Sequence, residues 1–229
     1  LQISVFEIEF FYVLPLNIFD ELTKEKRSMA INLTKGSRIN LAKEAPALKR
    51  LRVGLGWKPN ETDTGHEFDL DVTAFGLQVV GDKPDWIGSR NDPDFMVFYN
   101  NPNSVDGAIV HSGDNKTGAG EGDDESITID LTKLDKRVDE ISFIVTIEEA
   151  GPRRQNFGQI PKSHIALYND ETGDLIARYD LGEDFSNETA VQFGSVYKRE
   201  DGAFAFKAVG AGYNLGLGEF VKGYGGNPA

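Results

Sequence analysis

The stretch FDLDVTAFGL, which runs from Phe68 to Leu77, decides the fold class of this chain. Apolar and polar residues alternate from Phe68 onward, and a period of two is the pattern of a β-strand with one buried face. In such a strand Phe68, Leu70 and Val72 share one face, and Asp69 and Asp71 share the other. The stretch therefore predicts a strand that carries two aspartates roughly 7 Å apart on the same side.

Similar short runs recur along the chain, separated by turn sequences such as GDKPD, NDETGD and REDG. The clearest are LRVGLGW (51–57), DFMVFYN (94–100), SITIDL (126–131), EISFIVTIE (140–148), HIALYN (164–169), LIARYDL (175–181), TAVQFGSVYK (189–198) and AFAFKAVG (203–210). Successive strands without long helices between them favour an antiparallel arrangement over β-α-β units. We expect an all-β, two-sheet antiparallel β-sandwich, with short helices only at Leu131–Val138 and near Leu217–Lys222.

A second acidic segment, DNKTGAGEGDDE, extends from Asp114 to Glu125. It contains five carboxylates and one cation, and three alternating glycines allow its backbone to turn sharply. So many like charges in a tight loop favour a hard divalent cation, and calcium accepts irregular oxygen cages more readily than magnesium does. A solvated acidic loop without an ion is the simpler alternative.

An EF-hand does not explain this loop, although Asp114 and Glu125 have the spacing of its first and last ligands. Lys116 and Gly118 stand where oxygen ligands are needed, and Ala119 stands where that motif requires glycine. The strand pattern SITID follows directly, so no flanking helix is indicated. If the Asp69–Asp71 strand end lies beside this loop, the two segments together supply oxygens for one or two ions.

Composition limits the kinds of partner. The chain has 229 residues, a net charge of −13 and no cysteine. An acidic surface repels phosphate backbones, so we expect no nucleic-acid partner, and an anionic membrane only peripherally, through bridging cations. The lack of cysteine excludes disulfides, thiolate catalysis and direct thiol reduction of a substrate by this chain.

The sequence contains no enzyme signature. His66, His111 and His164 lack the spacing of a metalloprotease motif, and the glycine-rich segments lack the Lys-Ser/Thr of a P-loop. No serine lies in a GxSxG turn. We therefore expect a protein that is not an enzyme and has no small-molecule substrate.

Residues 1–28 differ from the rest of the chain. They start at Leu1, contain an apolar run interrupted by Glu7, Glu9 and Pro15, and end in DELTKEKRS before Met29. This is a poor secretory signal and too short for a transmembrane helix. We expect an upstream extension or cloning remnant of low order, with an accessory strand or helix as the alternative.

Several of these motifs together resemble one family. MAINLTKGSRINLAKE from Met29, the FDLDVTAF run, HSGDNKTGAGEGDDE and IEEAGPRRQNFGQI are similar to the TerD-type proteins of the tellurite-resistance family. The resemblance covers Met29–Gly223 and leaves a short glycine-rich tail, 224–229. It implies a β-sandwich that binds calcium, with two ions expected, in a bacterial cytoplasmic stress protein linked to resistance against tellurite, other toxic agents, phage and colicins.

The resemblance also implies a set of metal ligands. They are the carboxylates of Asp69, Asp71, Asp114, Asp123, Asp124 and Glu125, with Asn115 and the carbonyls of Gly118 and Gly120. Glu148, Glu149 and Asn156 are secondary candidates, and Arg153 and Arg154 are expected to pair with carboxylates. We further expect Asp71 and Asp124 to share one ion.

Two classes of function remain open on the sequence. The first is a calcium-dependent interaction module, whose partners are expected to be other proteins of the same stress system, or a module that uses calcium to reach membrane lipids as C2 domains do. The second is a metal-dependent hydrolase, in which an incompletely ligated ion activates water. The absence of a histidine ligand set and of an evident general base favours the first.

Overall fold

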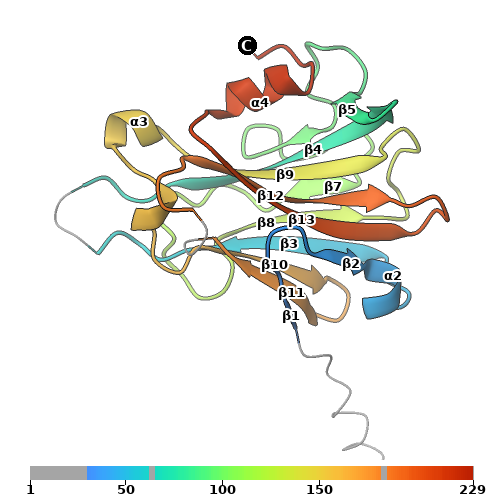
Figure 1. Ribbon diagram of the computed structural model, residues 1–229, viewed down its shortest axis with the longest axis horizontal. Helices are drawn as coiled ribbons and strands as arrows, with labels where there is room; N and C mark the ends of the chain where they lie inside the picture. Colours follow the sequence, from blue (N-terminus) through green and yellow to red (C-terminus); the bar gives the residue numbers. More distant parts are fainter. Residues whose placement is uncertain (1–29, 62–64, 182–184, 229) are drawn as a thin grey trace, which may run out of the picture.

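The computed structural model describes residues 30–61, 65–181 and 185–228. The segment 1–28 therefore lies outside the described residues. Within them the chain forms two β-sheets that pack face to face, with short helices only at their margins (Figure 1). The predicted all-β sandwich is confirmed.

The first sheet has six strands in the order β1-β11-β10-β3-β8-β7. All its neighbours are antiparallel except β1, which runs parallel to β11. Its strands are β1 (Ile31–Asn32), β3 (Arg50–Gly56), β7 (Ile109–His111), β8 (Glu125–Asp130), β10 (His164–Asn169) and β11 (Leu175–Asp180).

The second sheet has seven antiparallel strands, with the path β2-β13-β12-β9-β4-β5 and β6 paired to β4. Its strands are β2 (Arg38–Asn40), β4 (Leu70–Val80), β5 (Lys83–Trp86), β6 (Met96–Val97), β9 (Glu140–Ile147), β12 (Ala190–Lys198) and β13 (Phe204–Tyr213). The predicted strand at 94–100 is thus reduced to the two residues of β6.

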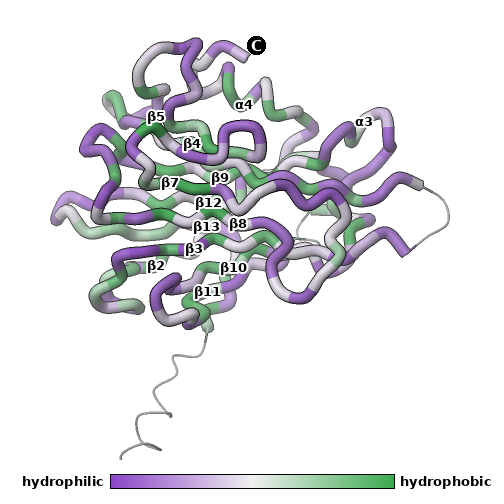
Figure 2. Tube along the Cα trace, turned by 180° about the vertical axis from the view of Figure 1, so that it is seen from behind, coloured by the Kyte–Doolittle hydropathy of each residue, from purple (hydrophilic) through white to green (hydrophobic). Residues whose placement is uncertain are grey.

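Alternation along the strands explains the two apolar layers. In β4, Leu70 and Val72 face the core between the sheets, whereas Phe75 and Leu77 belong to a smaller cluster on the opposite face. That smaller cluster is covered by α4 (Leu217–Gly223). Most of β4 is therefore buried on both faces of its sheet. Figure 2 shows the hydrophobic residues concentrated in the strands and the hydrophilic ones in the loops.

The helices agree only partly with prediction. α4 confirms the expectation near Leu217–Lys222, but the helix predicted at Leu131–Val138 is wrong, because the structure has successive turns there. Aspartates cause the turns: Asp130 accepts from the Thr132 N–H at 3.0 Å, and Asp135 accepts from the Arg137 N–H at 2.9 Å. Such local side-chain bonds compete with the helical ones.

Three further short helices were not expected. They are α2 (Leu41–Glu44), α3 (Ala150–Arg153) and the 3₁₀ helix η1 (Phe157–Gln159). None exceeds four residues, which is too short for a helical hydrophobic period to be read from sequence.

The described part of the glycine-rich tail is attached to the second sheet. The Trp86 N–H donates to the Tyr224 carbonyl at 2.9 Å, and the rings of Tyr224 and Phe75 lie 5.1 Å apart. Burial raises the pKa of the Tyr224 hydroxyl to about 12, even though its hydrogen bond with Ser142 opposes that rise. The tail therefore seals the cluster beneath α4.

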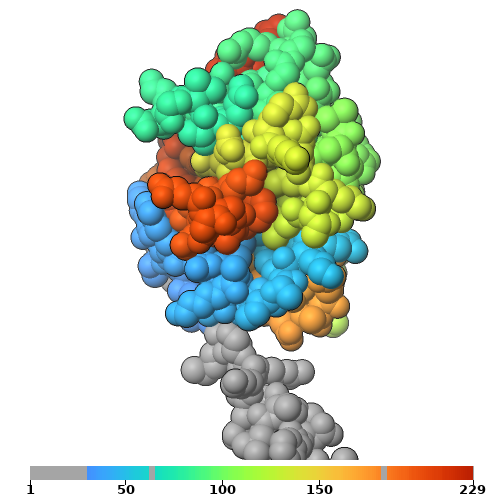
Figure 3. Space-filling model, turned by 90° about the vertical axis from the view of Figure 1, so that its right-hand side faces the viewer, coloured from blue at the N-terminus to red at the C-terminus, as the bar shows by residue number. Residues whose placement is uncertain are grey.

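Three connections gather at one end of the sandwich, on the left of Figure 1. They are the described parts of the β3–β4 connection, the β7–β8 loop that contains Asp114, and the segment with α3 and η1. Figure 3 shows the opposite end, formed by α2, the β8–β9 connection and the β12–β13 hairpin. The two acidic segments of the sequence thus meet at one end of the fold.

Candidate metal centre

Asp69 and Asp71 lie at the start of β4, where this strand is paired with β9. The Glu148 N–H donates to the Asp69 carbonyl at 2.9 Å, which continues the ladder past the end of the strand. Both aspartates are buried: Asp69 is 8% exposed to solvent and Asp71 is 5% exposed. A strand pattern that predicts an exposed acidic face therefore yields two buried carboxylates instead.

Asp114 completes a cluster with these two aspartates. One carboxylate oxygen from each of the three residues lies within 4.8 Å of the other two. Two cations are close: Arg153 Nη1 lies 3.6 Å from Asp69 Oδ2, and Lys116 Nζ lies 3.4 Å from Asp114 Oδ2. The cluster thus joins the two acidic segments, and its negative charge is partly balanced by neighbouring side chains.

Burial and mutual repulsion disturb the ionisation of this cluster. Burial, followed by the charges of Glu125 and Asp69, raises the pKa of Asp71 from 3.8 to about 8. Burial also raises the pKa of Asp69, although Arg153 opposes that shift. Tyr99 has a raised pKa, chiefly from burial and then from Asp71. A cation among these groups would counteract both the burial and the repulsion that favour the protonated form of Asp71.

Glu125 connects the two sheets beneath the cluster. It is fully buried; its Oε2 accepts from the Val72 N–H at 3.0 Å, and its Oε1 accepts from the Asn115 N–H at 3.2 Å. His111 Nδ1 accepts from the Gly113 N–H at 2.9 Å, so its Nε2 carries the proton and faces Glu125 Oε2 at 3.4 Å. Glu125 therefore fixes the loop to the unpaired edge of β4.

Asn115 and Asp124 form the frame of the loop. Asn115 Oδ1 accepts from the N–H groups of Thr117 and Gly118 at 3.1 Å, and its Nδ2 donates to Asp124 Oδ1 at 3.2 Å. Asp124 Oδ2 accepts from the Trp57 N–H at 2.9 Å. Both Asp124 oxygens are thus used in holding the loop, and Asp71 faces Asp114 and Glu125 rather than Asp124.

The loop glycines have different surroundings. Gly118 has a φ of +64°, and a Cβ there would collide with the indole of Trp57. Gly120 lies beside Asp124, since a Cβ placed on it would be 3.9 Å from Asp124 Oδ1. At Gly118, glycine is therefore required both by the left-handed backbone and by close packing.

Asp123 lies apart from this cluster, on the outer face of the first sheet. Its carboxylate forms an ion pair with Arg52, accepts from the Tyr168 hydroxyl at 3.3 Å, and lies 3.8 Å from His164 Nε2. Burial alone would raise its pKa, but hydrogen bonds from His164 and Arg52 outweigh that effect and lower it. The structure thus separates Asp123 from its neighbour Asp124.

We expect Gly54→Ala to destabilise the protein by roughly 1 to 3 kcal/mol. A Cβ at Gly54 would collide with the Asp123 carboxylate, and would force it away from Arg52. Denaturant unfolding of this variant measures the loss. Gly223→Ala is the matched control, because a Cβ at Gly223 meets nothing within 4 Å. Equal stability of the two variants would contradict the packing argument.

The secondary candidates have distinct positions. Glu148 is close enough to raise the pKa of Asp69 and Asp71, whereas Glu149 pairs with Arg153 at 3.2 Å. Asn156 is the N-cap of η1. Asp71, Tyr99 and Glu148 also line a groove of about 530 Å³ that extends to α4. Sequence reasoning missed Tyr99 and the groove, because no local pattern links Tyr99, the end of β9 and the start of α4.

Comparison with known proteins identifies the relatives of the chain. The family model described as TerD domain matches residues 29–224. General stress protein 16U of Bacillus subtilis (strain 168) is 45% identical over 197 residues, which cover 86% of this chain and 98% of that protein. Tellurium resistance protein TerD of Alcaligenes sp is 48% identical with the same coverage.

A solved structure shares the fold. The crystal structure of a homologue of telluride resistance protein (TerD) from Streptomyces coelicolor A3(2) has a TM-score of 0.61 and 21% sequence identity, and the match covers 80% of this chain and 100% of that one. Separately, no helix among the described residues is long and apolar enough to cross a membrane.

Proposed function

Because the chain belongs to the TerD domain family, we propose that it is a calcium-binding stress-response protein of the tellurite-resistance type. The proposed calcium ligands are the carboxylates of Asp69, Asp71 and Asp114. The observation that carries the proposal is the convergence of these three side chains from two separate segments.

The donor set fits calcium. Calcium takes six to eight oxygen ligands at about 2.4 Å, so two oxygens on one ion lie at most about 4.8 Å apart. The three aspartates meet that limit. They supply up to six carboxylate oxygens, and within the described ranges no histidine joins this cluster. An oxygen-only set of this kind suits a hard cation. The second ion implied by the family resemblance stays a prediction.

We place the action of the ion at the groove of about 530 Å³, which Asp71 and Glu148 line. Bound calcium supplies positive charge where the metal-free protein has clustered carboxylates. The groove then changes from acidic to near neutral, and this favours a different partner surface. On this proposal the protein is a calcium-dependent interaction module rather than an enzyme, and other proteins of the same cytoplasmic stress system are its partners.

Calcium should bind at least tenfold more tightly than magnesium, a difference of about 1.4 kcal/mol. Magnesium requires a nearly ideal octahedron, whereas buried carboxylates from two separate segments suit a larger, irregular shell. Isothermal titration of the metal-free protein with each ion measures the ratio. Equal affinities for the two ions would contradict calcium selectivity.

The interaction role is tested by co-purification. The tagged protein is isolated from stressed cells of its source with calcium or with chelator, and bound proteins are identified by mass spectrometry. We expect a calcium-dependent set that is lost in Asp71→Asn and retained in Asp82→Asn, a variant in the exposed β4–β5 turn. The same proteins with and without calcium would contradict the role. Calcium-dependent hydrolysis of a phosphoester by the purified chain would favour the hydrolase alternative.

A further inference from the structure

Arg153, the last residue of α3, joins two carboxylates that have different positions in the fold. Its Nη1 lies 3.6 Å from Asp69 Oδ2. On its other side, Nη2 lies 3.2 Å from Glu149 Oε2, and Nε donates to the same oxygen at 3.3 Å. One guanidinium group therefore connects a proposed calcium ligand with a carboxylate outside the aspartate cluster.

The two carboxylates differ in their surroundings. Asp69 is buried and belongs to the cluster with Asp71 and Asp114. The side chain of Glu149 is 59% exposed, and this residue lines the groove of about 530 Å³. Arg153 thus reaches from the proposed ion site to the wall of the groove in which a partner is proposed to bind.

Burial makes the contact with Asp69 one that opposes a metal ion. The side chain of Arg153 is only 18% exposed, so solvent and salt screen its charge poorly. Lys116, which pairs with Asp114, is by contrast an exposed residue, and pairs at exposed positions contribute little. A guanidinium held against Asp69 therefore repels a divalent cation that binds the same carboxylate.

Glu149 gives Arg153 a second position. The contacts of Nε and Nη2 with Glu149 do not depend on Asp69. The planar fork of a guanidinium pairs well with a single carboxylate through two parallel N–H groups. The side chain can therefore leave Asp69 and still keep a counter-charge.

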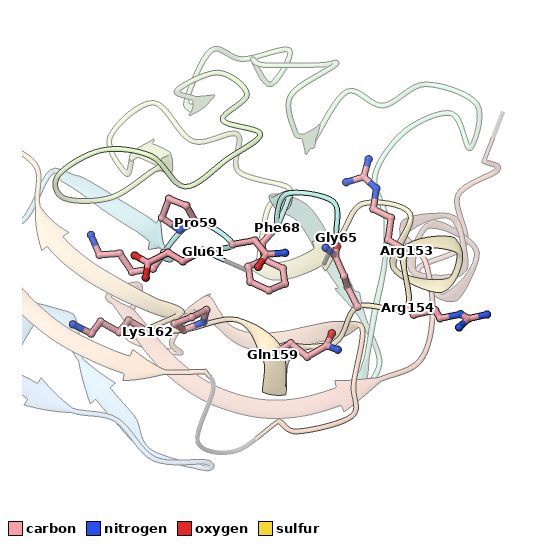
Figure 4. A pocket seen from close by; sticks show the side chains of 12 residues that line it. Pro59, Glu61, Gly65, Phe68, Arg153, Arg154, Gln159 and Lys162 are labelled. Carbon is pink, nitrogen blue, oxygen red and sulfur yellow. The ribbon is translucent and has the colours of Figure 1, made fainter. Parts of the chain in front are cut away.

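Arg154 offers a comparison within the same segment. The pairing with carboxylates that the sequence predicts is confirmed for Arg153, whereas Arg154 forms no salt bridge with any described residue. Arg154 is exposed, and Figure 4 shows the two guanidinium groups pointing away from each other. The adjacent cation thus has no comparable position between two carboxylates.

We propose that Arg153 competes with calcium for Asp69 and relays calcium binding to the groove. This inference rests on the calcium proposal above. In the metal-free protein Arg153 balances part of the charge of Asp69. It leaves Asp69 when calcium binds there, and it then pairs with Glu149 alone. The charge of Glu149 on the groove wall is thereby balanced only in the calcium-bound protein.

Calcium titration of matched variants tests the competition. Arg153→Gln removes the charge and keeps a polar side chain, and Arg154→Gln makes the same change at the next residue. Isothermal titration should show calcium affinity at least about tenfold higher in Arg153→Gln, and changed by less than about threefold in Arg154→Gln. Arg153→Lys keeps the charge and should bind calcium about as the unaltered protein does. If Arg153 merely holds Asp69 in position for the ion, Arg153→Gln binds calcium more weakly.

A double-mutant cycle in calcium affinity tests the relay. In the protein with Arg153, Glu149→Gln removes the group that receives the displaced guanidinium, so affinity should fall at least about threefold. In the Arg153→Gln background the same change should have a clearly smaller effect, because no guanidinium is displaced there.

Thermal unfolding in chelator establishes that each variant is folded. Equal or weaker calcium binding by Arg153→Gln, or an equal gain in Arg154→Gln, would overturn the competition. Equal effects of Glu149→Gln in the two backgrounds would overturn the relay. In these cases calcium still binds the unaltered protein, and the calcium proposal stands. If neither the unaltered protein nor any variant binds calcium, the calcium proposal fails and this inference fails with it.

Discussion

Saturating calcium should raise the melting temperature of this protein by roughly 5 to 10 °C. A ligand that binds only the folded state at 100 times its Kd stabilises that state by about 2.7 kcal/mol. For a domain of this size each kcal/mol corresponds to roughly 2 to 4 °C. The physical source is the cluster of Asp69, Asp71 and Asp114, whose charges repel one another without an ion. Differential scanning fluorimetry with calcium and with chelator measures the shift.

Substitutions in the aspartate cluster test whether calcium raises the melting temperature by binding there. Asp71→Asn and Asp114→Asn each remove one charge from the cluster while keeping an oxygen, so each should abolish most of the calcium-induced shift. Because both residues contact one proposed ion, the double variant should lose less affinity than the sum of the single losses. Asp82→Asn, an exposed charge in the β4–β5 turn, should leave the shift unchanged. Additive losses at positions 71 and 114 would show that they serve separate sites.

Alternating strands are the part of this fold that sequence predicts well. HIALYN becomes β10 with the expected bounds, because one face of it enters the core between the sheets. The error at Leu131–Val138 has a local cause, since Asp130 and Asp135 bind nearby N–H groups and impose turns. Helical spacing among Leu131, Leu134 and Val138 was outweighed by these side-chain bonds.

The candidate site was predictable only in its composition. Asp123 and Asp124 are adjacent, yet one faces Arg52 on the outer face of a sheet and the other caps Trp57. In a glycine-rich loop the direction of each side chain depends on φ values that composition does not determine. The meeting of Asp71 with Asp114 depends on the pairing of distant strands. Glu125 connects the two sheets because its carboxylate accepts the Val72 N–H, which a neighbouring strand does not take.

Asp71→Asn should have opposite effects on stability in metal-free and calcium-loaded protein. Burial and the charges of Glu125 and Asp69 raise the folded-state pKa of Asp71 from 3.8 to about 8. A group with a raised pKa contributes its full stability below the unfolded-state pKa and loses it as pH rises through the folded-state pKa. In chelator, the unaltered protein should therefore lose stability from this group between about pH 4 and pH 8.

Asparagine does not titrate, so the variant lacks that loss. At pH 8 in chelator we expect Asp71→Asn to be more stable than the unaltered protein by on the order of 5 kcal/mol, since each pKa unit between 3.8 and about 8 corresponds to about 1.4 kcal/mol. At pH 4 the difference should vanish, because Asp71 is then protonated in the folded state. With calcium at pH 8 the order should reverse, since an ionised Asp71 binds the ion and asparagine binds it poorly. Urea unfolding at both pH values, with and without calcium, measures all four differences. A variant that is less stable than the unaltered protein in chelator at pH 8 would show that Asp71 is ionised there without a metal, because its neighbours then stabilise the charge instead of opposing it.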